Sequence, residues 1–234
     1  MKTEVKKTMK KIGILGGMSY ESTIKYYELI LKKYYETFHD FNYPEIVIFS
    51  LNFQKVIDYE LNNEKEKYIE YLISGIRSLR NAGVEFIIMA ANSPHSVYNE
   101  LESLSEIPIL SIVDVTAEQA KKLNMQRILL LGIKYTMQSS YYQESFKKIG
   151  IDVITPSLED QEIIDGIIFN ELVIGSLKDS SKNELLKIIR KHVVDGVILG
   201  CTELPLILKQ ADIELILLDT MDIHTTEALK YCLE

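Results

Sequence analysis

Eight short apolar runs, separated by longer helical segments, constrain the fold of this 234-residue chain more than any other feature. The runs are rich in Ile, Val and Leu and show little polar alternation, which is typical of strands covered on both faces. The predicted strands are residues 11–16, 46–51, 85–90, 108–112, 127–132, 153–155, 196–200 and 215–218. The predicted helices include residues 21–35, 64–81, 117–123, 139–149 and 162–174. Strand–helix alternation predicts an α/β fold with mostly parallel sheets flanked by helices.

Two local signals mark helix ends in the second half of the chain. Ser181 and Glu184 have the spacing of a capping box before the apolar positions of a helix, so Ser181 is predicted to cap it. Gly175 is predicted to end the preceding helix.

The two halves of the chain resemble one another at three places. The stretch 14–27 resembles 130–142, the stretch 108–118 resembles 215–227, and the end of strand 85–90 matches the end of strand 196–200. Repetition in the same order predicts two similar lobes, residues 1–112 and 113–220, with the terminal helix 221–234 returning to the first. Ligands of open α/β sheets bind at strand ends, so we expect an interlobe cleft with Ala91 and Cys201 facing each other across it.

Composition narrows the class of protein. The formal net charge is −8 and the sequence pI is about 5.2, which argues against nucleic acid or an anionic membrane as a partner. No apolar run approaches the length of a membrane-spanning helix. With only two cysteines a disulfide framework is not expected, and the prediction is a cytoplasmic protein. His39, His192 and His224 are dispersed and show no metal-ligand spacing, so no metal is predicted.

Residues with useful chemistry follow the two matched strands. Cys201 stands at the end of one strand, before a predicted helix start that would lower its thiol pKa and make it a thiolate base or nucleophile. Asn92, Ser93 and Thr202 offer amide and hydroxyl groups at helix N-termini, which favour a carboxylate. The alternative is that Cys201 is a small buried apolar residue and Thr202 an ordinary helix cap.

Four motifs in order, at residues 13–23, 91–95, 171–175 and 200–203, resemble the cofactor-independent aspartate/glutamate racemase family. The resemblance implies two α/β lobes, a homodimer, and exchange of the Cα proton of an acidic amino acid without pyridoxal phosphate. It also implies two facing thiols, because inversion needs protonation from the side opposite to deprotonation.

The sequence departs from this family pattern at Ala91, which stands where the first thiol belongs. Cys201 is then the surviving acid/base, and Ser93 keeps a hydroxyl in place of the family's Thr. Three readings follow: an amino-acid racemase, a one-base relative like the decarboxylases of the same superfamily, or a non-catalytic protein that binds an amino acid or dicarboxylate.

Supporting roles are predicted for several neighbours. His95 either acts through water or orients Asn92, and Glu203 either tunes Cys201, holds the substrate ammonium or complements a helix start. Met18 and Ser19 follow the first strand and are predicted to line the cleft. The paired tyrosines at 26–27, 34–35 and 141–142 are predicted to be half-buried helix faces or dimer contacts.

Overall fold

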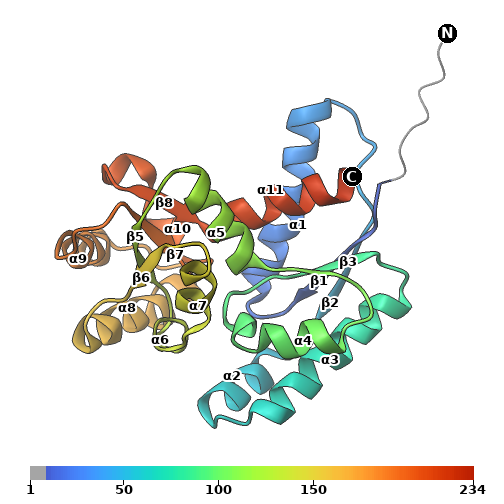
Figure 1. Ribbon diagram of the computed structural model, residues 1–234, viewed down its shortest axis with the longest axis horizontal. Coiled ribbons are helices and arrows are strands. Elements are labelled where there is room, and N and C mark those ends of the chain that lie inside the picture. The colour runs from blue at the N-terminus through green and yellow to red at the C-terminus, as the bar shows by residue number, and fades with distance from the viewer. Residues whose placement is uncertain (1–8) are drawn as a thin grey trace. The chain divides into compact units, whose positions relative to one another are not determined.

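The computed structural model describes residues 9–234 and divides into two compact units (Figure 1). Among the described residues, unit 1 comprises residues 9–90 together with Val97–Ser111 and His224–Glu234. Unit 2 comprises Ala91–Ser96 and Ile112–Ile223. The segment Ala91–Ser96, which the predicted boundaries assign to the first lobe, therefore packs with unit 2.

Each unit contains one four-stranded parallel sheet. In unit 1 the sheet order is β2-β1-β3-β4, with strands β1 (Ile12–Gly16), β2 (Ile46–Ser50), β3 (Phe86–Met89) and β4 (Ile109–Leu110). In unit 2 the order is β6-β5-β7-β8, with strands β5 (Arg127–Leu131), β6 (Asp152–Ile154), β7 (Gly196–Leu199) and β8 (Ile216–Asp219). The eight predicted strands and the α/β fold are confirmed.

Helices connect the strands in both units. Those before β5 are α1 (Tyr20–Phe38), α2 (Phe53–Leu61), α3 (Lys65–Asn81), η1 (Ser93–Val97), α4 (Tyr98–Leu104) and α5 (Ile112–Lys122). Those after it are α6 (Lys134–Gln138), α7 (Tyr141–Lys147), α8 (Leu158–Asn170), η2 (Leu172–Ile174), α9 (Asp179–Arg190), α10 (Leu204–Ile207), η3 (Gln210–Asp212) and α11 (Thr220–Leu233). None of the helices among residues 9–234 has the length and apolarity needed to cross a membrane.

The sheet of unit 2 is covered on both faces. Leu129 and Leu131 pack in one buried cluster with side chains of α8 and α9, whereas Ile128 and Leu130 pack in another with side chains of α5 and α7. Successive side chains of a strand point to opposite faces, so these two clusters lie on the two sides of the sheet. This double coverage explains why the strands lack polar alternation.

The strand register makes Ala91 the structural counterpart of Cys201. In unit 1, Met89 pairs with Leu15, and the next amide, that of Ala90, donates to the Leu15 carbonyl at 2.9 Å. In unit 2, Leu199 pairs with Leu131, and the amide of Gly200 donates to the Leu131 carbonyl at 2.7 Å. One residue further along, the first unit's strand leads to Ala91 and the second's to Cys201.

The match between residues 108–118 and 215–227 is shifted by one residue in the structure. Ile87 of β3 pairs with Ile109, and its counterpart Val197 of β7 pairs with Leu217. Ile109 therefore corresponds to Leu217, whereas the sequence comparison set it against Ile216. Runs of Ile and Leu look alike after a one-residue slip, and only the pairing across the sheet fixes the register.

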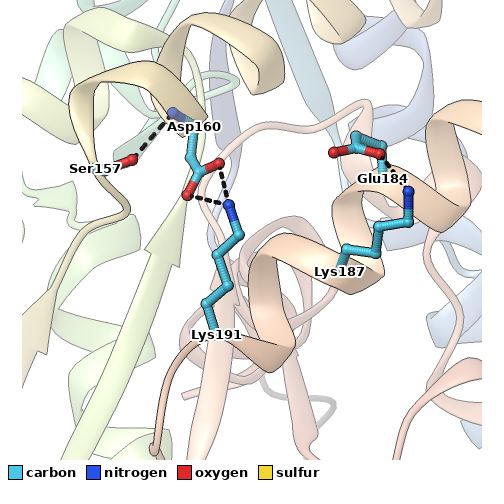
Figure 2. Close-up of polar contacts among 5 residues, drawn as sticks. All are labelled: Ser157, Asp160, Glu184, Lys187 and Lys191. Carbon is cyan, nitrogen blue, oxygen red and sulfur yellow. Dashed lines mark hydrogen bonds and ion pairs between the residues drawn. The ribbon is translucent and has the colours of Figure 1, made fainter.

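The predicted helix cap at Ser181 is wrong. Helix α9 begins at Asp179, two residues before Ser181, and Ser181 donates its hydroxyl to Glu171 Oε2 at 2.6 Å. Gly175 ends η2 in the left-handed conformation, with φ of 73°, as predicted. Figure 2 shows the ion pair that joins α8 to the end of α9: Lys191 Nζ lies 2.6 and 2.9 Å from the carboxylate oxygens of Asp160.

Candidate functional site

The thiol of Cys201 lies in a tight turn directly after β7. Helix α10 begins at Leu204 and has four residues, so the predicted helix start after Cys201 is confirmed, whereas the N-cap position belongs to Glu203 and not to Thr202. The expected lowering of the thiol pKa is wrong too. Burial, followed by the negative charge of Glu203, raises the pKa of Cys201 well above its ordinary value.

Glu203 is the immediate partner of the thiol. Cys201 Sγ donates to Glu203 Oε2 at 2.9 Å, and Thr202 Oγ1 donates to the same oxygen at 2.8 Å. Cys201 and Glu203 are both buried. Asp165 of α8 also contributes negative charge that raises the thiol pKa. At neutral pH this arrangement keeps the proton on sulfur, beside a carboxylate that can accept it.

The equivalent turn after β3 carries no ionisable counterpart. Ala91 is buried, and Ser93 is the first residue of η1 instead of its cap. By the same register, Asn92 corresponds to Thr202 and Ser93 to Glu203. The two strand ends therefore share a backbone position but differ in chemistry, because one offers a thiol and a carboxylate and the other a methyl group and a hydroxyl.

A buried chain of hydrogen bonds ties the Asn92 turn to the end of β7. Tyr142 of α7 donates its hydroxyl to Asn92 Oδ1 at 2.7 Å, and Asn92 Nδ2 donates to Thr220 Oγ1 at 3.2 Å. Thr220 Oγ1 in turn donates to the carbonyl of Leu199 at 2.9 Å, two residues before Cys201. Both ends of the Asn92 amide thus have buried partners within unit 2.

His95 holds the same turn through both ring nitrogens. The backbone amide of Ile112 donates to Nε2 at 3.1 Å, so Nε2 carries no proton, and the proton on Nδ1 faces the Asn92 carbonyl at 3.2 Å. Burial lowers the pKa of His95 from 6.5 to about 4. The imidazole is therefore neutral at physiological pH and connects the Asn92 turn to the start of α5.

Met18 and Ser19 lie in unit 1, directly after β1, and both are buried. Ser19 caps α1 by accepting the amide of Ser22 at 3.3 Å. Thr23 Oγ1 donates to the Ser19 carbonyl at 2.7 Å and accepts the amide of Gly17 at 2.8 Å. A side chain at Gly17, where φ is +87°, would meet the Leu51 carbonyl at 2.4 Å, so this turn requires glycine.

Sequence reasoning missed Thr220. The signal that could have found it is the repeat, because Thr220 is the first residue of the helix after β8 just as Ile112 is the first residue of the helix after β4.

Among the described residues no three His, Cys, Asp or Glu side chains are grouped closely enough to hold a metal ion.

The chain is similar to one family model and to known racemases. Residues 15–228 match the family model described as Asp/Glu/Hydantoin racemase. The broad specificity amino-acid racemase RacX of Bacillus subtilis (strain 168) is 27% identical over 220 residues, which is 89% of this chain and 92% of that protein. The glutamate racemase of Aquifex aeolicus (strain VF5) is 26% identical over 176 residues, 72% of this chain and 65% of that protein.

Two solved structures resemble nearly the whole chain. A candidate Asp/Glu racemase from Yersinia pestis has a TM-score of 0.90 and 33% identity, covering 97% of this chain and 100% of that one. An aspartate racemase homologue from Pyrococcus horikoshii OT3 has a TM-score of 0.86 and 37% identity, with the same coverage.

Proposed function

The chain belongs to the Asp/Glu/Hydantoin racemase family, and we propose that it exchanges the Cα proton of an amino acid without pyridoxal phosphate, using Cys201 as its acid/base. The single observation that carries this proposal is the contact of 2.9 Å between the Cys201 thiol and the Glu203 carboxylate at the end of β7. A buried thiol beside a proton acceptor fits proton transfer better than simple packing.

The raised pKa of Cys201 sets the order of the proton transfers. A resting thiol cannot remove a Cα proton until it has lost its own. In the proposed first step the thiol proton moves to Glu203, and the thiolate then takes the Cα proton, leaving a carbanion stabilised by the substrate carboxyl group. The reverse transfers return both protons, so no proton is gained or lost over the cycle.

Ala91 makes this chemistry one-sided. The position equivalent to Cys201 has no ionisable group, and the two nitrogens of His95 are engaged with Ile112 and Asn92. Glu203 lies on the same turn as Cys201. We therefore expect Cα exchange with solvent to outpace inversion of configuration, because no second base is positioned to protonate the opposite side.

The proposed substrate is aspartate, glutamate or a related amino acid. Support comes from the relatives, one described as a broad specificity amino-acid racemase and others as glutamate racemases. Hydroxyls of Ser93 and Thr202 at the two strand ends, with Asn92, are proposed to hold the substrate carboxylate, and Met18 and Ser19 to line the site. Glu203 is also suited to the substrate ammonium.

The test is proton–deuterium exchange at Cα in D2O, measured by NMR, together with chiral chromatography, over a panel of L- and D-amino acids. We expect exchange in the native chain, its loss in Cys201→Ala, and no change in Cys232→Ala, the matched control at the other cysteine. Ala91→Cys should raise the rate of inversion on the order of 10²- to 10⁴-fold, the usual contribution of a general acid–base group.

Other outcomes would overturn parts of the proposal. Rapid inversion by the native chain that Ala91→Cys does not change would mean that another second base is present. Binding of amino acids without any exchange, in the native chain and in Ala91→Cys, would favour a binding protein.

A second candidate function is protonation of a carbanion on one face only, as in a decarboxylase. The observation that favours it is that the Cys201 thiol holds a proton as a hydrogen-bond donor, whereas the equivalent strand-end position, Ala91, has no acid/base group. A 2-substituted malonate is the matching probe, because loss of CO2 from it leaves such a carbanion. Release of CO2 that depends on Cys201 would support this function over racemisation.

A further inference from the structure

The hydroxyl of Thr220 is held in one place and in one hydrogen-bonding role. Asp219, the last residue of β8, pairs with Leu199 of β7, so the residue after it lies beside the Leu199 carbonyl. The carboxylate of Asp219 accepts the amides of Met221 and Asp222 at 3.0 Å each and so fixes the first turn of α11. The buried Thr220 hydroxyl donates to the Leu199 carbonyl at 2.9 Å. Because a carbonyl oxygen only accepts, the single hydroxyl hydrogen of Thr220 is committed to it.

This commitment determines which end of the Asn92 amide faces Thr220. A hydroxyl whose hydrogen is already used can only accept, so the amide atom that lies 3.2 Å from it must be the donor, Nδ2. The amide oxygen Oδ1 then points the other way, and Tyr142 donates its hydroxyl to it at 2.7 Å. The orientation of the Asn92 amide therefore follows from its neighbours, and in the end from a backbone carbonyl.

The Asn92 amide keeps one donor for a ligand. Its nitrogen carries two hydrogens, and the contact with Thr220 uses one of them. This nitrogen makes no other hydrogen bond to residues 9–234. Asn92 is buried, and a buried N–H group without an acceptor costs free energy that a ligand oxygen recovers. In this orientation the amide suits a carboxylate oxygen and does not suit an ammonium group.

We propose that Thr220 is the positioning residue that makes Asn92 a hydrogen-bond donor to the substrate carboxylate, with Tyr142 supporting the opposite end of the amide. This inference rests on the proposed function, in which Asn92 helps to hold that carboxylate. Without the Thr220 hydroxyl, the Tyr142 hydroxyl is able to accept as well as to donate. The amide is then able to turn over and present its oxygen, which repels a carboxylate.

Isothermal titration calorimetry with L-aspartate and L-glutamate measures the dissociation constant without turnover. Asn92→Ala removes the donor and should raise that constant on the order of 10- to 100-fold, the range for a hydrogen bond to a charged group. Thr220→Val should raise it on the order of 10-fold, because the donor remains but its orientation is no longer fixed. Thr220→Ser keeps the hydroxyl and should bind as the native chain does. Binding by Thr220→Val that equals native binding would overturn the inference.

A double-mutant cycle separates positioning of Asn92 from a general effect on the fold. In a chain that already carries Asn92→Ala, Thr220→Val should weaken binding no further, because the group that Thr220 orients is gone. A loss of binding that persists in that background would overturn the inference. Tyr142→Phe makes the same test with the contact between Thr220 and Leu199 intact, and it replaces Thr220→Val if circular dichroism shows that variant unfolded.

Thr116→Val is the matched control. Thr116 is also a buried residue of unit 2, and its hydroxyl donates to a backbone carbonyl, that of Ile112, at 2.6 Å. This substitution should lower the free energy of unfolding and leave the dissociation constant unchanged. A loss of binding in Thr116→Val equal to that in Thr220→Val would overturn the inference.

The same measurements distinguish failure of this inference from failure of the proposed function. Binding that couples Thr220 to Asn92, without Cα exchange, would support the positioning role and overturn the proposed reaction. Cα exchange without that coupling would support the reaction and overturn the positioning role. A native chain that binds neither aspartate nor glutamate would also overturn the positioning role.

Discussion

The buried imidazole of His95 makes the free energy of unfolding depend on pH. Burial lowers the pKa of His95 from 6.5 to about 4. The unfolded chain therefore binds a proton at His95 below about pH 6.5, while the folded chain resists it until about pH 4. The contribution of neutral His95 to the free energy of unfolding is fully present above about pH 6.5 and is lost as the pH falls toward about 4. A pKa difference of this size corresponds to about 3 kcal/mol.

The geometry explains the resistance to protonation. A proton on Nε2 would point at the amide of Ile112, which is itself a donor at 3.1 Å. Protonation then sets two donors against each other in a buried site and breaks the link between the Asn92 turn and α5. Loss of this link in the folded chain near pH 4 should also lower activity, since the turn carries Asn92 and Ser93, which are proposed to bind the substrate.

The measurement is urea unfolding followed by far-UV circular dichroism at about pH 7.5 and about pH 4, for the native chain and His95→Gln. Glutamine can accept the Ile112 amide but does not titrate in this window. The native chain should lose about 3 kcal/mol more than the variant. His39→Asn, at the exposed end of α1, should retain the native pH dependence. Equal losses in the native chain and His95→Gln would refute the assigned tautomer and restore His95 as a candidate base.

Two further changes test buried contacts of unit 2. Thr220→Val removes the donor to the Leu199 carbonyl and the acceptor of Asn92 Nδ2, which leaves two buried polar groups unpaired, so urea unfolding should show a loss of about 2 to 4 kcal/mol. The hydrogen bond from Lys191 lowers the pKa of Asp160. This pair stabilises the fold above the ordinary Asp pKa of about 4, and its contribution is lost as the pH falls through the lower folded pKa. Asp160→Asn should therefore reduce the loss of unfolding free energy that acid pH causes. An unchanged loss in this variant would show that the pair contributes nothing.

The sequence predicted the strands well because their burial leaves a strong local pattern. Leu129 and Leu131 face one helical layer and Ile128 and Leu130 the other, so all four residues from 128 to 131 of β5 are apolar. Short helices leave a weaker pattern. Helix α10 has four residues and begins three residues after Cys201. The direction of the thiol pKa was predicted wrongly because burial of Cys201 and the charge of Glu203 raise that pKa, and a helix start alone was considered.

Contacts between distant residues explain what the sequence could not predict at the site. Asn92 bonds to Thr220, 128 residues away, and to Tyr142, 50 residues away. Nothing in the local pattern around Asn92 indicates that both ends of its amide have buried partners. Cys201, in contrast, was identified as a candidate from its place at the end of a strand, and Glu203 from its nearness to Cys201 in the sequence.

The duplicated register also indicates why restoring a thiol at Ala91 should not make the two strand ends equal. Cys201 has a carboxylate two residues later, and the corresponding position after Ala91 is Ser93, whose hydroxyl is a far weaker proton acceptor. A cysteine at position 91 would have to lose its proton by another route. The two strand ends therefore differ at two positions, that of the thiol and that of its proton acceptor. Only the end with Cys201 and Glu203 has both groups.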